Sequence, residues 1–195
     1  MRMRVLGVGI RCSFAVFALA AVALAQQPRI SDFKNDLAPY VGSPQHAVER
    51  MLEMANLKPG ETLYDLGCGD GRILIAAAQR YKIKAVGVEI SEHLAREAVA
   101  KVKKEGLQNS VRIIHGNLLE TDLTTADVVT LYLNNSANES LRPNLERYLR
   151  PHTRVVSYDY PIPGWKPIDT SDTEGHSGDT HTIYLYEVPN SITKK

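Results

Sequence analysis

Three glycines at alternate positions, Gly67, Gly69 and Gly71, constrain this chain more than any other feature. They follow a short, mostly apolar run at residues 62–66 and precede a helical pattern that continues to about residue 81. Glycine lets a backbone turn tightly and approach a ligand closely. A strand, a glycine loop and a helix in this order place free backbone N–H groups at the carboxyl edge of a parallel sheet, where nucleotide-like ligands bind. The pattern therefore predicts an α/β fold with a cofactor site at that edge.

Two acidic residues stand where such a site needs them. Asp65 closes the first strand, and Glu89 lies near the end of the next apolar run, residues 85–90. Glu89 follows Gly69 at about the 20-residue separation at which an acid accepts hydrogen bonds from ribose hydroxyls. A glycine loop alone also makes a plain tight turn, but the strands, the helix and the spaced acid together favour cofactor binding. The GxGxG spacing differs from the GxGxxG of dinucleotide folds and disfavours a nicotinamide dehydrogenase.

Two other groups of reactive side chains carry a weaker signal. Cys68 is a candidate nucleophile, but the local sequence offers no base, so packing behind the cofactor is the favoured interpretation. His176, Asp179 and His181 have ligand-like spacing in a turn rich in glycine, serine and aspartate. A structural zinc site normally has four ligands, and no cysteine lies nearby. A solvated hairpin is expected there, and no metal site is predicted.

The stretch DLGCGDGR, at residues 65–72, resembles motif I of the class I (seven-strand) S-adenosylmethionine-dependent methyltransferases. Val88-Glu89 resembles the acidic motif that holds the ribose, and residues 115–118 resemble the adenine-side motif. An aspartate is common in that motif, and Asn117 stands in its place with an amide oxygen that can still accept a hydrogen bond. The resemblance implies S-adenosyl-L-methionine as cofactor. The binding residues that it implies are Tyr64, Asp65, Gly67, Gly69, Gly71, Glu89, Ile90, Asn117 and Leu118.

Outside the cofactor loop the resemblance becomes narrower. Segments 38–44, 127–134, 141–157 and 180–186 are similar in order and spacing to a group of small methyltransferases. This group includes archaeal broad-specificity protein lysine methyltransferases and mitochondrial lysine methyltransferases that act on membrane proteins of energy metabolism. The resemblance covers residues 38–188. It implies a single Rossmann-like, doubly wound domain of seven strands, with the last strand inserted antiparallel between the fifth and the sixth. It also implies a protein substrate with an exposed lysine.

Four residues are predicted on the acceptor side of this site. Tyr132, Asn134 and Asn135 end the predicted fourth strand, and Tyr40 lies in the segment expected to fold over the same mouth. Core packing is an equally good interpretation of Tyr132, because the alternation along a strand decides its face. Two other functions stay open: a methyltransferase for small molecules or other non-lysine acceptors, and an exported, non-catalytic ligand-binding relic of the fold.

The first 25 residues differ in kind from the rest. Arginines at positions 2, 4 and 11 precede an uncharged run at residues 12–24, and Ala23-Leu24-Ala25 is a small-x-small cleavage signal. This pattern predicts a secretory signal peptide and an exported or periplasmic domain; an inner-membrane anchor is the alternative. Without these residues, 20 basic and 22 acidic side chains remain, a net charge of −2. Nucleic-acid binders usually carry a basic face, so no nucleic-acid partner is expected.

The expected organisation is a leader at 1–25, a linker and site-covering segment at 26–44, and the methyltransferase domain at 45–190. Periodicity and capping residues predict helices at 45–57, 71–81, 92–105 and 141–149. Further strands are predicted at 111–114, at 127–134, from 165–168 onward and at 182–188.

Overall fold

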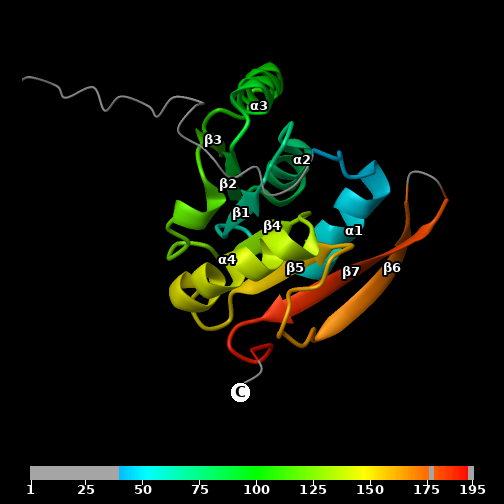
Figure 1. Cartoon of the computed structure of the whole chain (residues 1–195). Coiled ribbons are helices and arrows are strands. Elements are labelled where there is room, and N and C mark those ends of the chain that lie inside the picture. Colours follow the sequence, from blue (N-terminus) through cyan, green and yellow to red (C-terminus); the bar gives the residue numbers. More distant parts are fainter. Residues whose placement is uncertain (1–39, 176–177, 193–195) are drawn as a thin grey trace, which may run out of the picture.

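A computed structural model describes residues 40–175 and 178–192 of the 195-residue chain. Its elements form one seven-stranded sheet with helices on both faces (Figure 1). In chain order they are α1 (Gln45–Ala55), β1 (Thr62–Leu66), α2 (Arg72–Tyr81), β2 (Lys84–Glu89), α3 (Glu92–Lys104), β3 (Val111–His115), η2 (Leu118–Glu120), β4 (Val128–Leu131), α4 (Asn135–Tyr148), β5 (Arg154–Tyr158), β6 (Asp169–Glu174) and β7 (Thr180–Glu187).

The strands lie in the order β3-β2-β1-β4-β5-β7-β6. The first five strands pair in parallel, and β7 inserts antiparallel between β5 and β6. Leu66 at the end of β1 is in register with Leu131 of β4, and Leu131 is in register with Ser157 of β5. The carboxyl ends of these strands therefore share one edge, which is where open α/β sheets bind their ligands. The predicted Rossmann-like, seven-stranded topology is confirmed.

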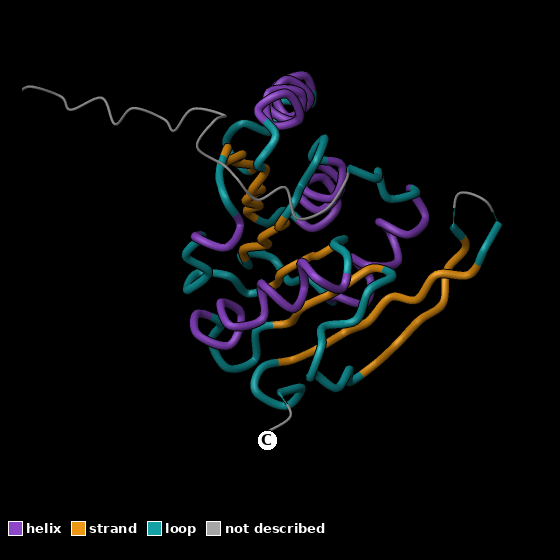
Figure 2. Tube along the Cα trace, viewed as in Figure 1, coloured by secondary structure: helices purple, strands orange, loops and turns teal. Residues whose placement is uncertain are grey.

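The two faces of the sheet are covered by different helices (Figure 2). Apolar residues of α1 and α2 pack with Leu63 and Val156 in one core cluster, which α3 joins through Val102. Apolar residues of α4 pack with Leu66 and Val155 in the other cluster. The alternation of side chains along each buried strand supplies both clusters, as expected for a sheet covered on both faces.

The fourth strand and the helix after it differ from the prediction. β4 ends at Leu131, and α4 begins at Asn135, six residues before the predicted start. Asn134 Oδ1 accepts a hydrogen bond from Ala137 N at 2.9 Å, so this residue caps the helix instead of extending the strand. Ala137, Leu141 and Leu145 form the buried stripe of α4, with Pro143 inside the helix. The sequence already held both signals, the cap and the apolar spacing.

The sixth strand also begins later than predicted. Residues 165–168 lie outside it, and β6 spans Asp169–Glu174. Trp165 is buried and forms only an isolated bridge with Ile192. Pro167 lacks a backbone donor, which explains why regular pairing starts beyond it. β6 is polar throughout and lies at the edge of the sheet, so apolar alternation could not reveal it.

The other helices and strands match their predicted ranges to within two residues. Residues 1–39, which include the predicted leader and most of the predicted linker, lie outside the described part, and so does His176. Among the described residues, no helix is both long enough and apolar enough to cross a membrane.

Candidate active site

The glycine loop joins β1 to α2 at the carboxyl edge of the sheet. The backbone φ angles of Gly67, Gly69 and Gly71 are +81°, +51° and +79°. Residues other than glycine rarely adopt such angles. The N–H groups of Gly67 and Cys68 both donate to the Val88 carbonyl, at 2.9 and 3.0 Å. A Cβ at Gly67 would lie 3.0 Å from Leu133, and one at Gly71 would lie 3.2 Å from Ala98. The loop thus lies tightly between β2, α3 and the segment that follows β4.

Glu89 holds this loop from the end of β2. Its Oε2 accepts a hydrogen bond from Gly69 N at 2.8 Å, and its Oε1 accepts one from Ser91 N at 2.8 Å. The residue is buried, with 7% of its surface exposed. Each carboxylate oxygen has a further lone pair, so the same group can also accept hydrogen bonds from ligand hydroxyls. The carboxylate therefore lies at the loop, as its sequence position predicts.

Asp65 is the second buried acid at this edge. Thr130 Oγ1 donates to its Oδ1 at 2.8 Å, and the residue is 3% exposed. Burial raises the pKa of this carboxyl group and is the largest effect on it. The hydrogen bond from Thr130 lowers the pKa, and the negative charges of Glu89 and Asp70 raise it further. Together they raise the pKa of Asp65 to about 7. A carboxylate held in this way favours a cationic ligand group beside it.

Tyr40 lies over the glycine loop. A Cβ at Gly69 would come within 2.4 Å of its ring, so only glycine leaves room for the tyrosine there. Arg72 fixes the segment in place: its guanidinium donates to Tyr40 Oη at 3.2 Å and to the Ser43 carbonyl at 2.8 Å. The tyrosine is 48% exposed. The site-covering role of residues 26–44 and the role of Tyr40 on the acceptor side both stay predictions.

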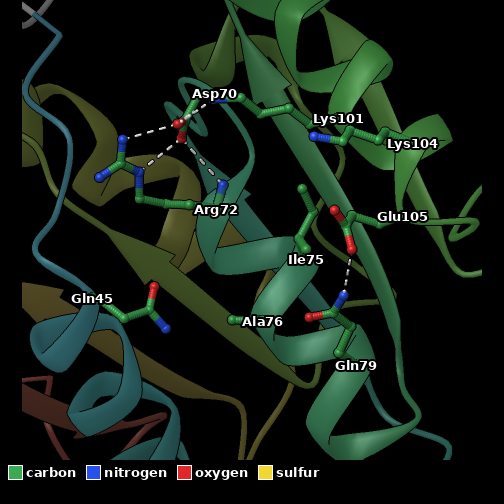
Figure 3. Close-up of a pocket in the computed structure, with 9 residues that line it drawn as sticks. All are labelled: Gln45, Asp70, Arg72, Ile75, Ala76, Gln79, Lys101, Lys104 and Glu105. Carbon is green, nitrogen blue, oxygen red and sulfur yellow. Dashed lines mark hydrogen bonds and ion pairs between the residues drawn. The ribbon is translucent and has the colours of Figure 1, made fainter.

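Asp70 links the loop to two helices through groups that sequence reasoning missed (Figure 3). Its carboxylate accepts hydrogen bonds from Arg72 at 2.9 Å and from Lys101 Nζ at 2.7 Å. Partial burial acts to raise the pKa of Asp70, but the hydrogen bonds and charges of the two cations outweigh it and lower the pKa to about 2. Lys101, in the last turn of α3, thereby ties that helix to the loop. It lies 31 residues from Asp70, so local pattern could not reveal the pair.

A groove opens between α2 and α3, beside the glycine loop (Figure 3). It is lined by Gln45, Asp70, Arg72, Ile75, Ala76, Gln79, Lys101, Lys104 and Glu105. Neither Asp65 nor Glu89 lines it. Several of its polar groups pair with one another, as Gln79 does with Glu105 at 3.1 Å. The groove therefore borders the cofactor edge at Asp70 and extends from there between the helices.

Of the remaining predicted cofactor residues, Ile90, Asn117 and Leu118 lie after the carboxyl ends of β2 and β3, and Tyr64 lies in the hydrophobic core. Asn117 caps η2 by accepting from Leu119 N at 3.0 Å, and Leu118 begins that short helix. Ile90 follows Glu89, and its carbonyl lies 3.1 Å from His115 Nε2. Tyr64 lies apart from this group: its ring packs in the core and its hydroxyl is 3.0 Å from Thr125 Oγ1.

Cys68 is buried among core residues behind the loop. A Cβ on Gly87 would lie 2.6 Å from its sulfur, so the thiol fills the space that glycine leaves in β2. Burial and the negative charges of Asp65 and Glu89 raise the pKa of the Cys68 thiol. The thiolate that a nucleophile needs is therefore disfavoured, and the packing interpretation is supported.

The three predicted acceptor residues after β4 are not equivalent. The Tyr132 ring is half-buried against Tyr158, at a centroid distance of 4.6 Å, and stacks with Tyr160 at 6.5 Å. Asn134 is engaged as the helix cap, and Asn135 is the exposed first residue of α4. Leu133, between them, lies against Gly67. The segment thus reaches the cofactor loop, and its aromatic ring belongs to a tyrosine cluster.

His181 lies on β7 instead of in the turn before it. Its Nδ1 is 2.9 Å from Asp159 Oδ1 and its Nε2 is 3.0 Å from Asp179 Oδ2. No group of three or more histidine, cysteine or acidic residues in the described ranges is arranged to hold a metal ion.

The strand order, the glycine loop and the paired acids define a class I methyltransferase. A crystal structure of an RNA methyltransferase from Salinibacter ruber, in complex with S-adenosyl-L-homocysteine, has the same fold: its TM-score is 0.74 at 41% identity. The alignment covers 80% of this chain and 98% of that one. The model of the ANTKMT methyltransferase domain family matches residues 65–169, and the chain belongs to this family.

Curated relatives of the chain carry lysine methyltransferase names. A "Protein-lysine N-methyltransferase" of Saccharolobus islandicus is 46% identical over 151 residues, which are 77% of this chain and 93% of the relative. An "Adenine nucleotide translocase lysine N-methyltransferase" of Mus musculus is 33% identical over 153 residues. That alignment covers 78% of this chain and 64% of the mouse protein, so the chain spans less than two thirds of that relative's length.

S-adenosylmethionine is the cofactor of this enzyme class, and the residues at the edge fit it. Glu89 offers carboxylate oxygens for the ribose hydroxyls, and the loop of Gly67, Gly69 and Gly71 lies directly beside it. The cofactor carries a positive sulfonium and ammonium, which suit an edge where Asp65 is buried beside Glu89. When bound, it supplies a methyl group that is already activated for displacement.

Asp65→Asn tests the charge at this edge. Because the pKa of Asp65 is about 7 in the folded protein and about 4 unfolded, the folded state holds more protons between these values. This group's contribution to stability therefore falls as pH rises from about 4 to 7. Asparagine keeps an oxygen for Thr130 and stays neutral, so the unliganded variant should be more stable at pH 8, on the order of 1–3 kcal/mol. The free energy of unfolding, measured with urea from about pH 4 to pH 8 for the parent and the variant, tests this prediction.

The exposed acid Asp169, replaced by asparagine, serves as the matched control and should change little. Asp65→Asn should also bind the cofactor more weakly. Equal pH profiles for parent and Asp65→Asn would contradict a raised pKa at this position.

Glu89→Ala tests the ribose contact. Removing a charge-assisted hydrogen bond costs about 1.5–3 kcal/mol, so cofactor affinity measured by calorimetry should fall ten- to a hundred-fold. Glu92→Ala, at the start of α3, removes an acid that pairs with Arg96 outside the loop and should leave the affinity near that of the parent. If Glu89→Ala remains folded and binds as tightly as the parent, the ribose assignment is wrong.

Proposed function

We propose that this enzyme transfers the methyl group of S-adenosylmethionine to lysine amines of proteins. The observation that carries the proposal is the 46% identity to a relative of that name over 93% of the relative's length. The described chain supports it, because it adds little to the core sheet and its helices. No additional domain among the described residues would keep a large substrate from the carboxyl edge.

The protein's part in this reaction is to align and desolvate the amine. A lysine needs a free lone pair to attack, and an apolar surrounding lowers the amine pKa and favours the neutral form. The rings of Tyr132, Tyr158 and Tyr160 gather at the ends of β4 and β5, next to the loop that Leu133 contacts. Holding two reactants in line can lower a barrier by about 7–11 kcal/mol, so no strong base is needed.

An RNA acceptor is the main alternative, because the structural neighbour at 41% identity is described as an RNA methyltransferase. The charge of this chain argues against it. Residues 26–195 carry a net charge of −2, and the carboxyl edge holds Asp65, Asp70 and Glu89. RNA binding draws mainly on basic surfaces that neutralise phosphates. Small-molecule acceptors are a further alternative.

Isotope labelling decides between these acceptors. The full chain is incubated with methyl-labelled cofactor and with membrane, soluble and RNA fractions of its own cells. We expect label in protein, recovered as methyl-lysine after acid hydrolysis and located by mass spectrometry. The family resemblance and the name of the mouse relative favour a membrane protein as acceptor. Label confined to RNA, to small molecules, or to carboxylates and thiols would exclude lysine methylation.

We also propose that residues 1–25 are an export signal that takes the chain into or across the inner membrane and is mostly cleaved after Ala25. The proposal rests on the arginines at 2, 4 and 11, the uncharged run at 12–24 and the Ala-Leu-Ala sequence before Gln26. N-terminal sequencing of protein purified from its own cells should give Gln26 first. A protein in the soluble cytosolic fraction that still begins at Met1 or Met3 would contradict it.

A further inference from the structure

The turn that follows β5 is strained. Tyr160 N donates to the Tyr158 carbonyl at 2.8 Å, which closes a three-residue γ-turn centred on Asp159. Asp159 has a φ of +67°, a rare conformation for a residue with a side chain, and γ-turns of this hand are uncommon. Strain of this kind persists only where the surrounding structure holds it, and it concentrates at functional sites.

Buried polar groups hold the turn from three elements. Ser157 Oγ and Asn138 Nδ2 donate to the Tyr160 carbonyl at 2.6 and 3.0 Å, and Asp159 N donates to the Thr182 carbonyl at 2.8 Å. Asn138 is fully buried, and its Oδ1 has no hydrogen-bond partner within the described residues. Asn138 thus gives its amide N–H group to the turn from a fully buried position.

The turn presents a carboxylate among aromatic rings. Asp159 lies between Tyr158 and Tyr160, and both rings are in contact with Tyr132. Burial raises the pKa of Tyr132, and the negative charge of Asp159 adds to this effect. The Asp159 side chain is 26% exposed, so a ligand can reach it.

The charge of this cluster is negative in every protonation state of its histidine. His181 stacks on Tyr158 and lies between the carboxylates of Asp159 and Asp179. Two carboxylates outweigh one imidazolium, so the group attracts cations. A carboxylate beside aromatic faces is the combination that recognises an alkylammonium.

We propose that Asp159 and the rings of Tyr132 and Tyr160 form the site that captures the lysine side chain of the substrate as an ammonium. The site lies at the ends of β4 and β5, the edge that also carries the glycine loop. Asp159 selects a cationic acceptor over a carboxylate or a neutral group. When the amine leaves Asp159 for the reacting position, it gives its proton to solvent water and its lone pair becomes free to attack. This inference rests on the proposed lysine methylation and names the residues that select its substrate.

The direct test is binding of n-butylammonium, which reproduces the end of a lysine side chain. The full chain, saturated with S-adenosyl-L-homocysteine and labelled in its tyrosine rings, is titrated and followed by NMR, with n-butanol as the neutral probe and n-butyrate as the anion. We expect butylammonium to shift the Tyr132 and Tyr160 resonances at lower concentration than either of the others. Asp159→Asn should reduce this preference about ten-fold.

Asp159→Gly separates recognition from folding. Glycine tolerates the positive φ, so this variant should unfold at the same or a higher temperature than the parent while losing the preference for the cation. Asp169→Asn, which removes an exposed acid on β6, is the matched control and should keep it. If Asp159→Gly is less stable than the parent but keeps its preference for the cation, Asp159 has only a structural role. That result would overturn the proposal.

Kinetic measurements separate the proposed capture site from the proposed lysine methylation. If the parent methylates lysine, Asp159→Asn should raise KM for the protein acceptor about ten-fold and change kcat little. An unchanged KM would overturn the capture site and leave lysine methylation intact. Selective butylammonium binding without any lysine methylation would support the capture site and reject the lysine function.

Discussion

The site depends on one carboxylate that joins two backbone segments. Glu89 accepts hydrogen bonds from Gly69 N in the glycine loop and from Ser91 N before α3, and it is almost fully buried. An ionised group is stable in such a place only when donors surround it. The carboxylate therefore fixes the loop against β2 and the start of α3, and it remains available to ligand hydroxyls. The proposed ribose contact would use the same group that holds the loop.

A second set of charges positions the covering segment. Arg72 contacts Asp70, Tyr40 and the Ser43 carbonyl, so a single guanidinium connects the loop to the chain that precedes α1. Lys101 brings α3 to the same carboxylate. Of the acids at this edge, Asp70 is thus paired with two protein cations, which lower its pKa, whereas burial raises the pKa of Asp65.

Local sequence predicts the parts of the molecule that local forces determine. The glycine loop, Asp65 and Glu89 can be found because their spacing follows from a strand, a turn and a helix. The polar edge strand β6 and the pairing of Lys101 with Asp70 escape such reasoning, since both depend on segments distant in sequence. The strained turn at Asp159 escapes it too. Aspartate is one of the residue types enriched at positive φ, but Tyr-Asp-Tyr-Pro alone does not place one there. One of the bonds that hold the turn comes from Asn138, which is distant in sequence.

A crystal structure of the full chain with S-adenosyl-L-homocysteine tests the central claim most directly. The account predicts that the ribose hydroxyls are hydrogen-bonded to Glu89, that the nucleoside lies along the loop of Gly67 to Gly71, and that the sulfur faces the tyrosines at the end of β4. A ligand seated instead in the groove between α2 and α3, or a Glu89 carboxylate without contact to the ribose, would contradict it.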